Sequence, residues 1–103
     1  MKDRYVFTAV LHFDDDGISI EYPDLPGCIS CADTVAEAKA NALEALELHL
    51  YCSEKYGDEI PEPTNYFEWD LKDNEIPLMV EVFMPAVRKE METQKDKGFA
   101  EVV

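Results

Sequence analysis

The sequence predicts a single α+β domain, with three strands, one long helix, a fourth strand and a short closing helix in that order. Three observations lead to this fold class. Apolar residues alternate over residues 5–13, an Ala- and Leu-rich run follows a helix-capping signal at residue 34, and residues 76–84 are almost continuously apolar. At 103 residues the chain is long enough for one hydrophobic core and too short for a second domain of any size.

The first two strands are predicted to form a hairpin. Residues 5–13 are apolar at every odd position and half polar at the even ones, which favours a strand inside the sheet. The Asp-Asp-Asp-Gly sequence at 14–17 supplies residue types that tolerate a tight hairpin turn. Residues 17–22 alternate again, so their isoleucines and Tyr22 are expected on the buried face.

A proline-rich turn follows the hairpin. Pro23 and Pro26 bracket Asp24, and together with Gly27 they hold the chain in a conformation that neither a helix nor a central strand tolerates. Residues 28–32 can then form a short third strand, which gives a three-stranded meander.

The long helix is predicted to begin after Thr34, because Thr34 and Glu37 have the spacing of a capping box. Gly57 is its expected end. Its apolar face comprises Val35, Ala38, Ala42, Leu46 and Leu50. The small alanines allow the helix to lie close to the sheet. Beyond it, the Ile-Pro-Glu-Pro sequence at 60–63 predicts a stiff extended connector, and residues 64–75 a loop.

The apolar run at 76–84 is typical of a strand covered on both faces. We expect it beside the first strand, and parallel to it because the crossover contains the long helix. A closing helix is expected to pack through Val87 and Met91 and to end at Gly98, followed by an extended tail over residues 99–103.

Charge is strong and unevenly distributed. The formal net charge of −14 resides in residues 1–84, where nineteen Asp and Glu outnumber five Lys and Arg, whereas residues 85–103 carry four of each sign. An acidic body repels phosphate backbones, so charge argues against nucleic-acid binding. A basic protein partner suits it better. The plainer explanation, that the acidity keeps the domain soluble, stays open.

Cysteine count and hydropathy predict a cytoplasmic protein. Three cysteines cannot form a complete set of internal disulfides, which favours reduced thiols in a reducing compartment. No run approaches the roughly 20 apolar residues of a membrane span, and the N-terminus lacks the pattern of a signal peptide.

The sequence predicts neither a metal site nor a catalytic site. The side chains of zinc-ligand type are Cys28, Cys31, His49 and Cys52. A helix that rises about 1.5 Å per residue from residue 34 carries His49 roughly 22 Å from its start, too far from the two earlier cysteines. The acids at 14–16 lie beyond the middle of the first strand, so the convergent carboxylates that a two-metal nuclease needs are missing. We expect no cofactor and no enzyme activity.

The Tyr-Pro-Asp-Leu-Pro-Gly-Cys segment at 22–28, the Asp-Thr start of the helix at 33–34 and the Ile-Pro-Glu-Pro sequence at 60–63 resemble the HicB antitoxin family in this order. The resemblance covers roughly residues 4–88. It implies a partial RNase H-like fold without nuclease activity, in an antitoxin of a type II toxin-antitoxin system. Such an antitoxin binds HicA, a small mRNA-cleaving ribonuclease, and blocks its active site. Dimers or higher oligomers are also implied.

The resemblance divides the chain into a HicB-like antitoxin domain over residues 1–84 and a C-terminal helix and tail over residues 85–103. Family members commonly carry a C-terminal domain that binds DNA. Residues 85–103 leave no room for one, so we do not expect this chain to bind DNA.

The expected toxin-binding residues are Asp14, Asp15, Asp16, Glu21 and Asp24 for charge, Pro26 and Gly27 for shape, and Trp69. Two assignments stay open: Asp24 suits a role within its own turn equally well, and Trp69 suits either core or interface. Phe67 is expected in the core. The alternative function is a stand-alone oligomeric or ligand-binding module of HicB type without a toxin partner.

Overall fold

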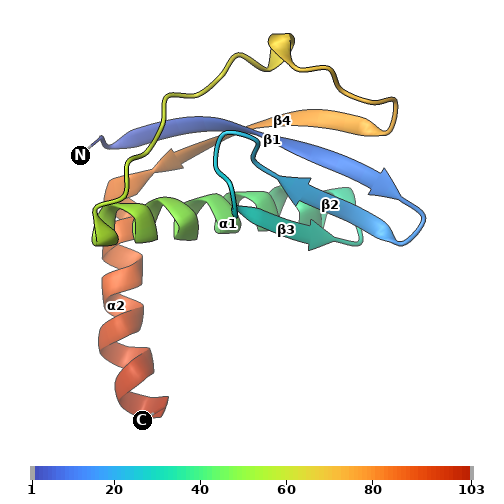
Figure 1. Ribbon diagram of the computed structural model, residues 1–103. Coiled ribbons are helices and arrows are strands. Elements are labelled where there is room, and N and C mark those ends of the chain that lie inside the picture. The colour runs from blue at the N-terminus through green and yellow to red at the C-terminus, as the bar shows by residue number, and fades with distance from the viewer. Residues whose placement is uncertain (1, 103) are drawn as a thin grey trace.

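The computed structural model describes the backbone of residues 2–102 and the side chains of residues 2–65 and 67–93. Within this part of the chain, four strands form one sheet in the order β3-β2-β1-β4, and helix α1 lies across one face (Figure 1). The predicted α+β fold is confirmed. The elements are β1 (Arg4–Asp14), β2 (Gly17–Glu21), β3 (Ile29–Ala32), α1 (Val35–Tyr56), the 3₁₀ turn η1 (Tyr66–Glu68), β4 (Glu75–Phe83) and α2 (Met84–Val102). Over the described residues, neither long helix is apolar enough to cross a membrane.

Strands β1, β2 and β3 form the predicted antiparallel meander. The β1–β2 hairpin closes with Asp14 opposite Gly17 and Phe13 opposite Ile18. Gly17 has a φ of 141°, and a Cβ at this position would lie 3.0 Å from the backbone oxygen of Ala32 on β3. Glycine therefore fits where a larger residue would force the two strands to shift.

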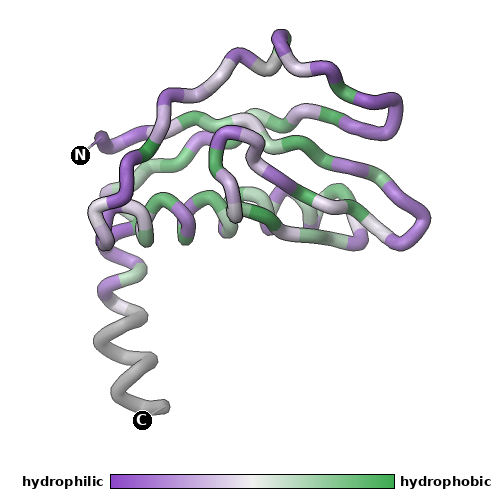
Figure 2. Tube along the Cα trace, viewed as in Figure 1, coloured by the Kyte–Doolittle hydropathy of each residue, from purple (hydrophilic) through white to green (hydrophobic). Residues whose placement is uncertain are grey.

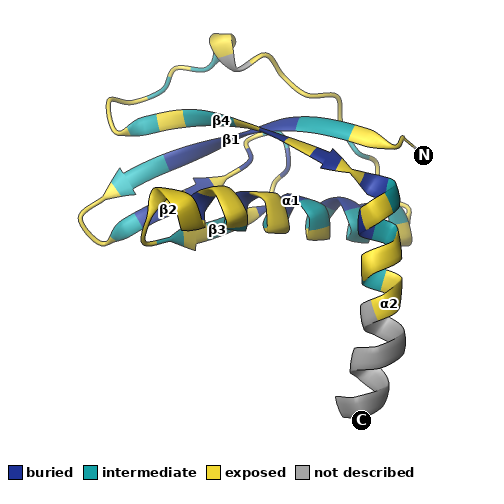
Figure 3. Cartoon of the chain, turned by 180° about the vertical axis from the view of Figure 1, so that it is seen from behind, coloured by how far each residue is buried: buried dark blue, intermediate teal, exposed yellow. Residues whose placement is uncertain are grey.

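The hydrophobic core lies between α1 and the sheet (Figure 3). Ala38 and Ala42 of α1 have no exposed surface, and they share one buried cluster with Phe7 and Ile20 of the sheet, so the small alanines let the helix lie close to the strands. The Tyr22 hydroxyl donates a hydrogen bond of 2.6 Å to the carbonyl oxygen of Ala42. Burial raises the pKa of Tyr22, so this hydroxyl keeps its proton and the hydrogen bond.

Helix α1 begins and ends where the capping signals predict. The Thr34 hydroxyl accepts a hydrogen bond from the Glu37 amide at 3.1 Å, and the Glu37 carboxylate accepts one from the Asp33 amide at 3.3 Å. Gly57 ends the helix in the left-handed conformation, with a φ of 72°. The placement of Val35 on the apolar face is wrong. Its side chain is 51% exposed, because side chains of a first turn point back beyond the helix end.

Strand β4 lies beside β1 as predicted, but the two strands are antiparallel, with Arg4 opposite Phe83. The prediction that β1 and β4 are parallel is wrong because it assumed that α1 alone connects the meander to β4. Helix α1 returns the chain to the end of the sheet where β1 begins, and Gly57 there lines the same hollow as Tyr5. Residues 57–74, called the connector here, then run back to the other end. There the Phe13 amide donates to the Asn74 carbonyl oxygen at 2.9 Å, and β4 starts from that end.

Strand β4 is covered on one face only, which corrects the prediction that both faces are buried. Val80 and Val82 point toward α1 and are at most 8% exposed. Met79 and Phe83 point away from α1 and are 61% and 45% exposed. The apolar run suggested two covered faces, but β4 is an edge strand and α1 lies on one side of the sheet.

Helix α2 is attached to the body through its first turns. Met84 and Val87 are buried in the core, and Met91 packs partly against it, as predicted for the last two. The Arg88 guanidinium donates to both carboxylate oxygens of Glu54 on α1, at 2.9 and 2.8 Å. This bidentate hydrogen bonding raises the pKa of Arg88. Arg88 therefore fixes α2 to the end of α1.

Helix α2 continues through Gly98 to Val102 and projects away from the sheet (Figure 1). The predicted helix end at Gly98 and the extended tail after it are wrong over these residues, while Val103 lies outside the described residues. A glycine inside a helix costs about 1 kcal/mol without stopping it. The Phe-Ala-Glu-Val sequence at 99–102 contains no proline to end the helix.

Replacing Leu46 with alanine is expected to destabilise the domain by about 2–5 kcal/mol, because the side chain has no exposed surface and its loss leaves a cavity in the core. Leu48→Ala is the matched control, since Leu48 is 52% exposed on the same helix. Urea denaturation followed by circular dichroism measures both. Equal losses in the two variants would contradict the packing described for α1.

Candidate functional site

The residues predicted to bind a partner lie at both ends of the sheet. Residues 14–16 form the tip of the β1–β2 hairpin, whereas Asp24, Pro26 and Gly27 lie in the β2–β3 turn at the opposite end. Strand β2 separates these two groups, and its 5 residues span roughly 17 Å. The structure therefore does not bring the predicted residues together in one cluster.

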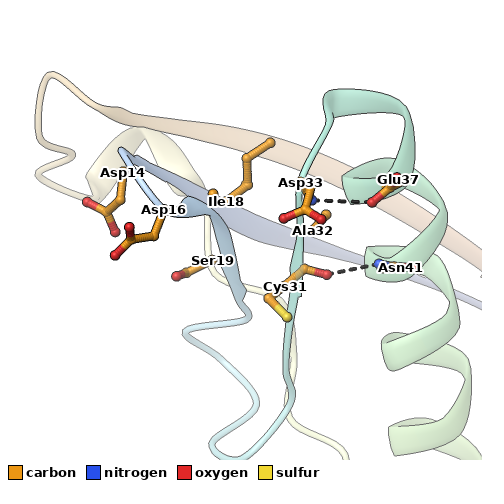
Figure 4. Close-up of a pocket in the computed structure, with 10 residues that line it drawn as sticks. Asp14, Asp16, Ile18, Ser19, Cys31, Ala32, Asp33, Glu37 and Asn41 are labelled. Atoms are coloured by element: carbon orange, nitrogen blue, oxygen red, sulfur yellow. Dashed lines mark hydrogen bonds between the residues drawn. The ribbon is translucent and has the colours of Figure 1, made fainter.

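A cavity of about 300 Å³ opens at the hairpin end, between the hairpin, β3 and the first turns of α1 (Figure 4). Its acidic lining comprises Asp14, Asp16, Asp33 and Glu37. Figure 4 shows the first two carboxylates on the hairpin and the other two at the start of α1. Among the residues that the structure describes, no group of three or more His, Cys, Asp or Glu is arranged to hold a metal ion. The cavity is therefore an acidic hollow that favours cationic groups.

Asp24 ties the connector to the β2–β3 turn. Its two carboxylate oxygens accept hydrogen bonds from the Thr64 amide at 2.8 Å and from the Thr64 hydroxyl at 2.7 Å. The turn itself is closed by backbone bonds and by Gly27, whose φ is 89°. Asp24 therefore has a structural partner forty positions away in the sequence, whereas Pro26 and Gly27 remain exposed beside it.

The face of the sheet away from α1 carries Glu21 and several exposed apolar side chains. Glu21 lies opposite Ile29 on β3, which is 70% exposed, and Met79 lies at the other edge of the same face. Figures 1 and 3 show the connector on this side of the sheet. We call this side the open face. Sequence reasoning included Glu21 and missed the two apolar residues, although the alternation within β4 could have signalled Met79.

The connector presents one of the aromatic residues expected in the core. Phe67 is 77% exposed, so its assignment to the core is wrong. The amide of Phe67 donates to the Asn65 side-chain oxygen at 3.0 Å, which fixes the backbone of the short turn η1. The side chain of Phe67 lies on the outside of this turn. Trp69 is half-buried, which leaves it between the two roles expected for it.

A polar network joins the hairpin to the start of β4. His12 lies between two carboxylates, with its Nδ1 3.2 Å from Glu75 and its Nε2 3.3 Å from Asp14. The Lys72 amide donates to Glu75 at 2.8 Å. This backbone hydrogen bond, with a smaller effect from His12, lowers the pKa of Glu75. The network fixes the end of the connector against the hairpin.

The three cysteines are free and occupy different environments. Cys28 is buried, Cys31 is exposed and Cys52 is half-buried. Burial raises the pKa of Cys28 to about 11, so its thiol is neutral at physiological pH. This is the behaviour of a core thiol, and it does not favour a metal ligand.

Comparison with known proteins gives one family match and several related folds. A model of the HicB-like antitoxin of bacterial toxin-antitoxin systems matches residues 7–95. An uncharacterised 14.9 kDa protein from the rep-hol intergenic region of Haemophilus phage HP1 is 40% identical over 47 residues. This match covers 46% of the chain, and it spans about a third (35%) of the phage protein's length.

Three solved structures share the fold. A chain of a HicA3 and HicB3 toxin-antitoxin complex is 25% identical, with a TM-score of 0.61 over 74% of this chain and 95% of that one. A chain of a toxin-antitoxin complex from Streptococcus pneumoniae is 15% identical, with a TM-score of 0.72 over 96% of this chain and 93% of that one. The N-terminal domain of the Burkholderia pseudomallei antitoxin HicB is 22% identical, with a TM-score of 0.64 over 76% of this chain and 98% of that one.

Asp24→Ala is expected to loosen the connector, because it removes both hydrogen bonds to Thr64. Amide hydrogen exchange at residues 57–74 should accelerate, and the free energy of unfolding should fall by about 1–2 kcal/mol. Asp15→Ala, on the exposed hairpin tip, serves as the control of equal charge. Unchanged exchange in Asp24→Ala would show that this contact does not hold the connector.

Thiol labelling tests the cysteine environments. At pH 8 iodoacetamide should modify Cys31 within minutes, whereas Cys28 should react only after denaturation, because its thiol is buried and its pKa is raised to about 11. Mass spectrometry of peptides from the native and the unfolded protein measures both rates. Equal labelling of the two cysteines in the native protein would contradict the burial of Cys28.

Proposed function

The chain belongs to the HicB-like antitoxin family, and we propose that it neutralises a small basic ribonuclease of HicA type by covering its active site. The observation that carries the proposal is the concentration of negative charge in the folded body of an antitoxin-family protein. Residues 1–84 hold the whole net charge of −14. A ribonuclease that binds messenger RNA needs cationic groups for the phosphates, and a surface of carboxylates competes for the same groups.

The fold suits an inhibitor that offers charge over several surfaces. Carboxylates lie on the hairpin tip at residues 14–16, on the open face at Glu21 and along the connector. Figure 2 shows the tip of the hairpin and much of the connector as hydrophilic. We assign toxin binding to residues 1–84, with Pro26, Gly27 and Trp69 as shape-determining contacts, and place Asp24 in a supporting role through its bonds to Thr64.

The wider setting follows from the same proposal. The family match supports a non-enzymatic role. Because the proposed partner cleaves messenger RNA, we propose that the pair acts in the cytoplasm. The structural relative from the HicA3 and HicB3 complex is itself part of a toxin-antitoxin assembly, which supports a toxin as partner. Self-association of the antitoxin is part of the proposal and is measured by light scattering of the purified protein.

Titration of the cognate HicA-type ribonuclease with this protein should abolish RNA cleavage near an equimolar ratio. The association rate should fall at least about tenfold between low and high salt, because complementary charge drives the encounter. Neutralising two hairpin charges, with Asp15→Asn and Asp16→Asn together, should slow association more than Glu92→Gln with Asp96→Asn. The second pair makes the same change in net charge on α2.

Undiminished RNA cleavage at a large excess of the protein, with no binding at low salt, would reject the antitoxin function. That result would favour a stand-alone module instead. If the two double variants slowed association equally, the association rate would depend on the net charge of the protein and not on the location of the charges at the hairpin tip.

A further inference from the structure

Phe67 holds an unusual place in a domain with a large core. Its side chain is 77% exposed, the largest fraction among the exposed large apolar side chains of the described residues. Removing the apolar surface of a phenylalanine from water is favourable, and folding leaves most of the surface of this side chain in water. The exposed part of the ring is therefore apolar surface that burial against a partner would remove from water.

The connector holds this ring in place. The Asn65 side chain and carbonyl accept hydrogen bonds from the amides of Phe67, at 3.0 Å, and Glu68, at 3.1 Å. One residue earlier, Thr64 is bound to Asp24 through two hydrogen bonds. At the far end, the Asn74 side chain donates to the Phe13 carbonyl oxygen at 3.0 Å. The ring is thus presented from a fixed turn, which lowers the entropy that binding would cost.

Carboxylates surround this position in the sequence. The connector contains one basic residue, Lys72, and six acids: Asp58, Glu59, Glu62, Glu68, Asp70 and Asp73. A central aromatic with charged neighbours is the usual anatomy of an interface hot spot and its rim. The charge of the rim selects a cationic partner.

The same charge excludes two other occupants. A second copy docking through this segment would place two connectors of net negative charge against each other, which costs free energy. Nucleic acid would meet the same repulsion from its phosphates. A basic protein remains as the chemistry that fits.

We propose that Phe67 is the apolar anchor of the toxin interface, inserting into an apolar pocket of the basic ribonuclease whose Lys or Arg side chains pair with Glu68 and Asp70. This inference rests on the proposed function and adds to it a contact that the charge pattern does not identify. It also gives the connector a binding role beyond joining α1 to β4.

The test compares Phe67→Ala with Tyr56→Ala in the full chain. Tyr56 is 70% exposed at the end of α1, so the control removes a similar exposed aromatic away from the turn η1. Calorimetric titration with the toxin should show that Phe67→Ala weakens binding by about 30-fold or more, the loss typical of a hot-spot residue. Tyr56→Ala should stay within about threefold of the original protein, and Phe67→Trp should retain most of the affinity.

The melting temperatures of all three variants, measured by circular dichroism, should equal that of the original protein, because these side chains are largely exposed. If the original protein binds the toxin and Phe67→Ala binds it equally well, the proposal that Phe67 anchors the interface is wrong and the antitoxin function stands. Equal losses in Phe67→Ala and Tyr56→Ala would also overturn the anchor. If the original protein neither binds nor inhibits the toxin, both proposals fail.

Discussion

The packing of α1 against one face of the sheet is the constraint from which the other features follow. Ala38 and Ala42 bring the helix backbone close to the strands, and the hydroxyl of Tyr22 binds the carbonyl oxygen of Ala42 at 2.6 Å. A helix held this way buries one side of each strand and leaves the other to the connector and to solvent. Exposed Ile29 and Met79 are a direct consequence of this one-sided cover.

The connector exists because of where α1 ends. The helix delivers the chain to the end of the sheet at which β4 must finish, so residues 57–74 have to return along the domain before β4 can begin. An extended segment of this kind needs tethers: Asp24 binds Thr64 within the segment, and Asn74 binds the Phe13 carbonyl oxygen at the end before β4. The segment required by topology is also the one that presents Phe67 and a row of carboxylates, so fold and proposed binding role are linked.

Local signals predicted most of the fold. Alternation located β1 and β2, the capping box and Gly57 bounded α1, and the motif at 22–28 identified the family. Strand direction could not be predicted in this way, because it depends on the course of the connector. The site was harder still: the bond between Asp24 and Thr64 joins distant positions, and the exposure of Phe67 depends on how η1 is held. Neither leaves a periodic pattern in the sequence.

The central claim is that the ribonuclease binds the acidic hairpin tip and the connector of this domain. Amide hydrogen exchange of the protein, measured alone and then saturated with the toxin, tests this most directly. The account predicts slower exchange in the complex at residues 57–74 and at the hairpin tip, with the exposed side of α1 unchanged. Protection confined to α1 or α2, with the connector and hairpin exchanging as in the free protein, would contradict it.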